Sequence, residues 1–162
     1  MPAATLHPNV PTNYQEWIEC FSILQSGKAE SAYIAFLRHG ALSAEGAVLM
    51  QFETRLIKTL NDMLNHLVRR FRLQFSQAQE IQDYDSVRIL YHRLLDDVHN
   101  CLFFEDLGFL PPAFREELAE SVRQQMRDFT GAILRGMGEG DEDLSPAAED
   151  MIFLIKRLSM LI

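Results

Sequence analysis

The sequence is poor in cysteine and has no long apolar run. Its 162 residues include two cysteines, Cys20 and Cys101, in no metal-binding or redox spacing. Isolated thiols of this kind are typical of core residues in a reducing compartment. No stretch reaches the roughly 18 uncharged apolar residues that mark a membrane-spanning helix, and the first residues lack the basic and apolar regions of a secretory signal. We therefore expect a cytoplasmic protein that does not enter a membrane.

Catalytic and cofactor-binding motifs are also missing. The chain has no phosphate-binding glycine motif, no Gly-x-Ser-x-Gly elbow, no His-Glu-x-x-His and no Cys-x-x-Cys. The glycines around Gly138 are set among acidic residues, which would repel a phosphate group rather than bind it. The sequence therefore predicts a non-enzymatic protein without a cofactor.

Positive charge is scarce. Fifteen Lys and Arg residues stand against 23 Asp and Glu residues, which gives a formal net charge of −8. The segment from Arg38 to Gln79 is mildly basic, whereas the segment from Glu80 to Asp150 is strongly acidic. The net charge disfavours nonspecific binding to nucleic acid or to an anionic membrane, and the two segments are expected to attract each other within the fold.

Proline is absent between Ser43 and Glu80, and this stretch has the strongest periodicity in the chain. Its apolar residues recur in steps of three or four, which predicts one face of a long helix over about 43–79, with Ser43 as its N-cap. That face comprises Leu49, Phe52, Leu56, Leu60, Met63, Leu67 and Phe71.

Shorter amphipathic segments surround this helix, and no alternating pattern typical of a strand occurs. We predict helices beginning near Asn13, over about 29–39, from Asp83 or Asp85 to about Leu107, over about 112–135, and from Ser145 to Ile162. The predicted fold is an all-α bundle of five or six helices around the long central helix.

We expect a single domain with a linker near its C-terminus. The predicted parts are a flexible N-terminal arm (1–12), a helical bundle (13–135), an acidic glycine-rich linker (136–144) and a C-terminal helix that packs on the bundle (145–162). Exchange of that last helix between two copies of the chain is the alternative to docking on its own bundle.

A polar cluster on the fourth predicted helix suggests a metal site. His92, Asp96 and His99 are spaced i, i+4 and i+7, so they share one helical face, and imidazole with carboxylate is a ligand set for zinc or iron. Asp62 and His66 could add a second pair. The face of His92 lies opposite the core stripe, however, so we favour an exposed polar surface and no metal.

The same outer face has two apolar residues, Ile89 and Phe103, beside the histidines. An apolar pair on a second face of an already amphipathic helix indicates contact on both sides. We predict that Ile89, His92, Asp96, His99 and Phe103 bind a partner protein. Burial of this face under the N-terminal helices is the alternative.

Three arginines, Arg69, Arg70 and Arg72, flank Phe71 and form the one basic cluster. Arginine beside an aromatic ring can bind phosphates or bases, but helical geometry scatters these three. We expect Arg70 to pair with Glu105, and we assign Arg69 and Arg72 to a smaller part of the partner-binding surface.

The sequence thus favours a helical protein–protein interaction module, such as an adaptor, a chaperone or a regulatory subunit. Its partner is another protein, and a homodimer is one form of this interaction. The first alternative is a metal-binding helical protein that uses His92, Asp96 and His99. The second is a nucleic-acid-associated helical subunit, which the negative charge makes unlikely.

Overall fold

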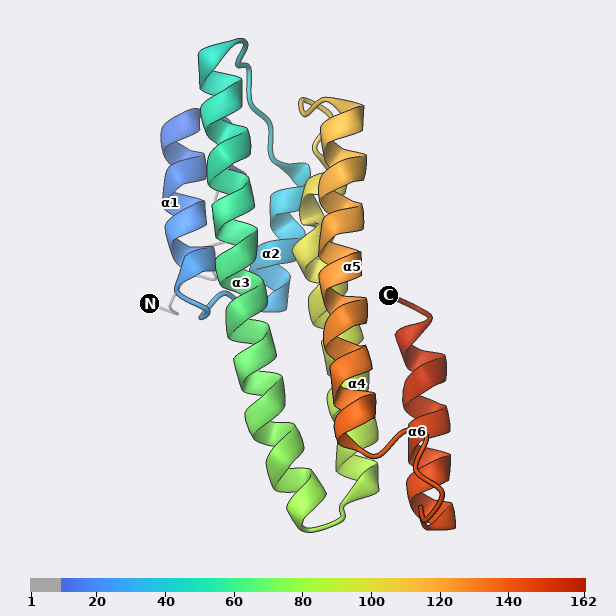
Figure 1. The fold of residues 1–162 in the computed structure, drawn as a ribbon. Coiled ribbons are helices and arrows are strands. Elements are labelled where there is room, and N and C mark those ends of the chain that lie inside the picture. Colours follow the sequence, from blue (N-terminus) through green and yellow to red (C-terminus); the bar gives the residue numbers. More distant parts are fainter. Residues whose placement is uncertain (1–9) are drawn as a thin grey trace, which may run out of the picture. The chain divides into compact units, whose positions relative to one another are not determined.

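A computed structural model describes residues 10–162 of the chain (Figure 1). Within these residues it contains six α-helices, two short 3-10 helices and no strand. The elements are α1 (Tyr14–Gln25), α2 (Ser31–Phe36), η1 (Leu37–His39), α3 (Ala47–Glu80), α4 (Tyr84–Cys101), η2 (Leu102–Asp106), α5 (Pro112–Gly136) and α6 (Pro146–Ser159). The predicted all-α helical bundle with one long helix is confirmed.

The chain forms two compact units, and the three longest helices contribute residues to both. The first unit comprises the described residues up to His66 together with Asn100–Ala119, and the second comprises Leu67–His99 and Glu120–Ile162. The predicted division into arm, bundle, linker and C-terminal helix follows other boundaries and stays a prediction. Most of the predicted arm, residues 1–9, lies outside the described residues.

The ends of α1 are fixed by side chains that the sequence places there. Asn13 caps its N-terminus, since the Asn13 side chain accepts a hydrogen bond of 2.9 Å from the backbone N–H of Glu16. At the other end, the His66 ring Nε2 lies 2.8 Å from the carbonyl oxygen of Gln25. Gly27 follows with a φ of +74°, the left-handed conformation that commonly ends a helix.

Aromatic rings form the core of the first unit around Trp17. The Trp17 side chain is fully buried, and its ring centroid lies 5.2 to 5.9 Å from those of Phe21, Phe52 and Phe109. Its indole N–H donates a hydrogen bond of 2.9 Å to the carbonyl oxygen of Ala41, so the one polar atom of the ring is satisfied. The loop before α3 is therefore held against α1.

The start of α3 differs from the prediction. The helix begins at Ala47, so Ser43 does not cap it. Gly46 has a φ of +58°, which lies outside the right-handed helical region, and the first helical turn therefore starts after it. The end at Glu80 is within one residue of the prediction.

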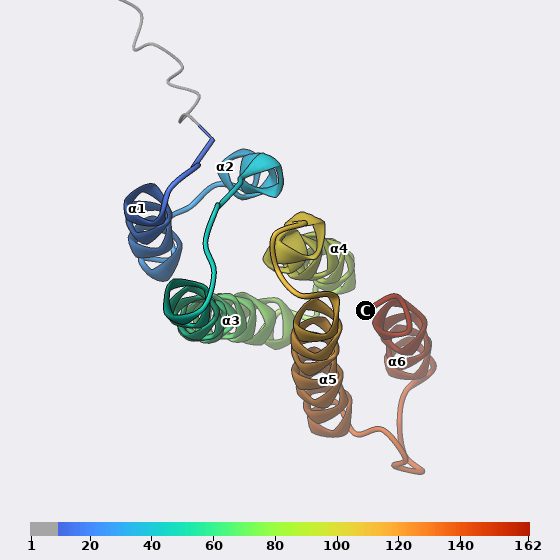
Figure 2. The same ribbon diagram turned by 90° about the horizontal axis from the view of Figure 1, so that it is seen from above.

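The second unit is built from the C-terminal half of α3 with α4, α5 and α6. Phe71 of α3 contacts Tyr91 of α4 and Phe129 of α5 edge-on, at centroid distances of 5.2 and 5.6 Å. Helix α6 runs beside α4 and α5 in both views (Figures 1 and 2), and it buries Met151, Ile152, Ile155 and Leu158. Leu161, in contrast, lies beyond the end of α6 and is 73% exposed.

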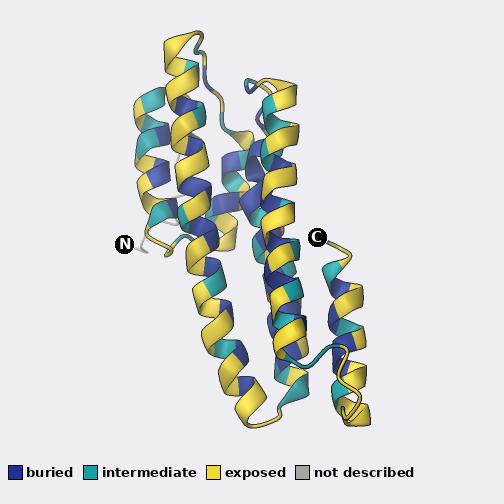
Figure 3. Cartoon of the chain, viewed as in Figure 1, coloured by how far each residue is buried: buried dark blue, intermediate teal, exposed yellow. Residues whose placement is uncertain are grey.

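Buried residues recur along one side of each long helix, and exposed residues cover the other (Figure 3). The exceptions are large apolar side chains on the exposed side, because these contact solvent without adding to the core. In the second unit they are Leu73, Ile81, Ile89, Phe153, Met160 and Leu161.

Candidate functional site

The predicted partner surface on α4 separates into an exposed part and a buried residue. Ile89, His92, Asp96 and His99 are all exposed, as expected for an outer helical face. Ile89 is 51% exposed, which is high for an isoleucine in a helix that already buries a full apolar stripe.

Phe103 does not belong to this face, and the prediction for it is wrong. Its side chain is fully buried in the first unit, where its ring lies 6.2 Å from that of Phe104. The α-helix ends at Cys101 and tightens into η2, so the rotation of 100° per residue no longer holds at Phe103. Because η2 contacts η1, the alternative of burial under N-terminal elements holds for this residue.

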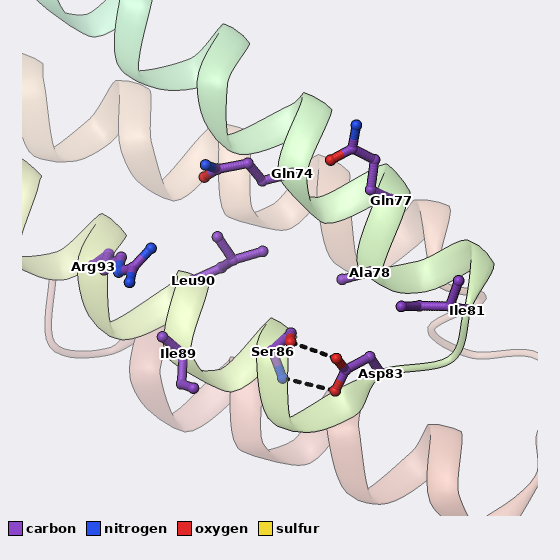
Figure 4. A pocket seen from close by; sticks show the side chains of 9 residues that line it. All are labelled: Gln74, Gln77, Ala78, Ile81, Asp83, Ser86, Ile89, Leu90 and Arg93. Atoms are coloured by element: carbon purple, nitrogen blue, oxygen red, sulfur yellow. Dashed lines mark hydrogen bonds between the residues drawn. The ribbon is translucent and has the colours of Figure 1, made fainter.

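An open groove of about 390 Å³ adjoins Ile89 in the second unit. It lies between the last turns of α3 and the first turns of α4, which form a helical hairpin (Figure 4). We call it the hairpin groove; its lining residues are Gln74, Gln77, Ala78, Ile81, Asp83, Ser86, Ile89, Leu90 and Arg93.

The hairpin groove has an apolar base and apolar edges. Ala78 and Leu90 are buried, and Leu90 points from α4 toward α3 (Figure 4). Ile81, at the end of the groove nearest the hairpin turn, is 74% exposed, and Ile89 lies on the α4 side. Four apolar side chains therefore line one open groove, an arrangement suited to contact with a second apolar surface.

The two charged side chains that line the groove, Asp83 and Arg93, differ in their hydrogen-bond partners. Asp83 accepts hydrogen bonds from the backbone N–H (3.1 Å) and the hydroxyl (2.5 Å) of Ser86, and these bonds lower the pKa of the Asp83 carboxyl. Arg93, in contrast, forms no hydrogen bond and no ion pair within 4 Å among the described residues, although its charge lowers the pKa of Asp97 one turn along α4. The guanidinium of Arg93 is therefore the charged group in the groove that is available to a partner.

An ion pair lies one helical turn beyond Arg93. The guanidinium of Arg70 donates a hydrogen bond of 3.1 Å to the carboxylate of Asp97. Burial raises the pKa of Asp97, while the Arg70 charge opposes that shift. The partner predicted for Arg70 is thus wrong: it pairs with Asp97 and not with Glu105. The backbone carbonyl of Glu105 accepts a hydrogen bond from Arg115 in the other unit.

The arginine cluster does not form a continuous phosphate-binding patch. Arg70 is paired with Asp97, and the guanidinium of Arg72 lies 5.3 Å from the centroid of the Phe129 ring. Both Arg69 and Arg72 are exposed. Since Arg72 covers an aromatic ring of its own unit, its placement has a structural explanation.

The residues proposed as metal ligands do not come together as a site. No group of three or more His, Cys, Asp or Glu side chains in residues 10–162 is arranged to hold a metal ion, and this includes His92, Asp96 and His99. Asp62 and His66 instead contact the C-terminal residue of α1, because Asp62 accepts a hydrogen bond of 3.1 Å from the Gln25 side chain. Cys20 and Cys101 are both buried, as predicted.

Of the residues that line the hairpin groove, the sequence prediction had assigned only Ile89 to a binding surface, and it missed Arg93 and the α3 side. Gln74, Gln77 and Ile81 come from the end of the long helix, where the predicted apolar stripe had ended. The sequence signal for the α3 side was Ile81, an isolated apolar residue between two predicted helices.

No known protein family, no curated protein and no solved structure gives a significant match to this chain. Among the described residues, none of the helices has the length and apolar character needed to cross a membrane.

Proposed function

We propose that this protein is a non-enzymatic helical module that binds another protein through the hairpin groove and the adjoining exposed face of α4. The observation that supports this most is that exposed Ile81 and Ile89 line one open groove together with Arg93. Apolar residues with a charged rim are the usual composition of a transient protein interface. His92 and Asp96 extend that rim along α4.

The role that follows is that of an adaptor, a chaperone or a regulatory subunit in the cytoplasm. Such roles need a stable scaffold and one exposed docking surface, and both compact units supply the buried cores of a scaffold. The buried thiols of Cys20 and Cys101 accord with a reducing compartment. The partner can be a different protein or a second copy of the chain.

Capture from a lysate of the source cells tests this proposal. Immobilised wild-type protein is compared with Ile89→Asp and with Ile57→Asp, a control at an isoleucine that is 41% exposed in the other unit. We expect a specific protein to be retained by the wild type and by Ile57→Asp and lost with Ile89→Asp.

Both variants must keep the wild-type circular dichroism spectrum for the comparison to count. Phe103→Asp would not serve, because a charge at a fully buried position destabilises the fold itself. Equal retention by Ile89→Asp and wild type would refute the assignment of the surface. Retention of nothing by any of the three would refute the interaction function.

A further inference from the structure

Three side chains form a straight row on the exposed face of α4. Asp85, Ile89 and Arg93 are spaced i, i+4 and i+8, which is the row of residues that forms a ridge along a helix. All three are exposed; the Asp85 side chain is 87% exposed and Ile89 is 51% exposed. In chain order, the row therefore consists of an acidic, an apolar and a basic residue.

This row is complementary to itself when reversed. If two α4 helices pack antiparallel about Ile89, each Ile89 meets the other, and each Asp85 meets an Arg93. A two-fold axis repeats every such contact, so one acid and one base per chain give two ion pairs per dimer. Packing of two rows with i±4 spacing is also the commonest class of helix–helix contact.

The existing partners of these charges leave them free for this pairing. Arg93 has no ion pair among the described residues. Asp85 forms an ion pair with Arg88 at 3.4 Å, and the Arg88 side chain is 54% exposed. An exposed pair at that distance contributes little, so it competes weakly with a contact to a second chain.

We propose that the Asp85–Ile89–Arg93 row is a homodimer interface, with a second copy of this chain packed antiparallel on it. This inference rests on the proposed function, because it names the partner of the same surface. In this pairing His92 lies near Ser86 of the second copy, so the flanking positions are polar and compatible. Ile81 and the hairpin groove border the contact and widen its apolar area.

Charge reversal and rescue test the pairing on the full chain. Sedimentation equilibrium is measured for the wild type, Arg93→Asp, Asp85→Arg and the double variant, at protein concentrations up to about 1 mM. We expect each single variant to raise the dimer dissociation constant about tenfold or more, because it creates two like-charge contacts per dimer. The double variant restores both ion pairs with reversed sign and should return to within about threefold of wild type.

Arg157→Asp is the matched control for the change in net charge. Arg157 is exposed on α6 in the same unit, away from the row, and the substitution alters the total charge by the same amount as Arg93→Asp. Its dissociation constant should equal that of the wild type. Circular dichroism verifies that every variant keeps its helical content.

Cross-linking locates the two-fold axis independently. Ile89→Cys places a single reactive thiol on the proposed axis, since the native Cys20 and Cys101 are buried. A short bismaleimide should therefore link two chains of Ile89→Cys efficiently, and should link Ile57→Cys, a control in the other unit, much less.

A wild-type chain that stays monomeric throughout the concentration range would overturn the homodimer. So would a dimer that is insensitive to both single reversals, a double variant that fails to recover, or equal cross-linking of the two cysteine variants. In each case the capture experiment with Ile89→Asp still decides separately whether the surface binds a different protein.

Discussion

The sharpest structural prediction concerns Gly40, which lies against the indole ring of Trp17. A Cβ atom added at Gly40 would lie 2.3 Å from Trp17 Cζ2 and 2.7 Å from Cη2, well inside van der Waals contact. Gly40 has a φ of −65° and a ψ of 156°, a conformation open to any residue, so the effect of Gly40→Ala is purely steric. The ring cannot retreat easily, because it is fully buried among Phe21, Phe52 and Phe109.

Forcing one methyl group into such a core reduces the free energy of unfolding by about 1–3 kcal/mol. For a chain of this size that corresponds to a fall in Tm of about 2–12 °C. Urea unfolding followed by far-UV circular dichroism gives the change in stability. Trp17 is the single tryptophan of the chain, so its fluorescence reports the same site directly.

Gly108→Ala is the matched control. A Cβ atom at Gly108 meets no atom within 4 Å, so this variant should stay within about 0.5 kcal/mol of wild type. Trp17→Phe introduces a smaller ring, so Gly40→Ala should lower the free energy of unfolding less in that background than in the wild type. A double-mutant cycle measures this difference. If Gly40→Ala and Gly108→Ala have equal stability, the packing of Trp17 described above is incorrect.

Three further substitutions probe the second unit. Because burial raises the pKa of Asp97, the protonated carboxyl favours folding, and this contribution is lost as the pH rises from about 4 through the raised pKa. Asp97→Asn should remove that fall in the free energy of unfolding, which urea titrations at several pH values measure. Arg72→Gln should lower the free energy of unfolding by about 0.5–1 kcal/mol, since it removes the cation from the Phe129 ring. Tyr91→Phe should raise it by about 1–3 kcal/mol, because the buried Tyr91 hydroxyl has no hydrogen-bond partner that meets geometric criteria among the described residues.

The arginine and tyrosine substitutions each have a control of the same chemistry on an exposed or half-buried side chain. Arg69→Gln should be neutral, and Tyr84→Phe should not stabilise the protein. If Tyr91→Phe instead lowers the free energy of unfolding, then the Ser159 hydroxyl, which donates to the carbonyl oxygen of Ile155, also forms a hydrogen bond with the Tyr91 hydroxyl. If Arg72→Gln and Arg69→Gln change the free energy of unfolding equally, the cation–π contact of Arg72 does not stabilise the protein.

The helices and several of their ends were predictable because their signals are local. A cap such as Asn13, or Ser145 before Pro146, acts on backbone groups within three residues of itself, and both side chains form those bonds. Apolar spacing likewise encodes which face of α6 is buried, since the face depends on the 100° rotation between residues of one helix. The limits of that rule appear at Phe103, where the helix tightens and the rotation changes.

By itself, then, the sequence determined the all-α class, the long helix and the exposed face of α4 that carries Ile89, His92, Asp96 and His99. The tertiary structure alone decided which residues meet from distant parts of the chain. It paired Arg70 with Asp97, 27 positions away, and brought Ile81 and Ile89 to the same groove. Such contacts depend on how side chains of different helices fill a shared space, and the spacing within one helix carries no information about that.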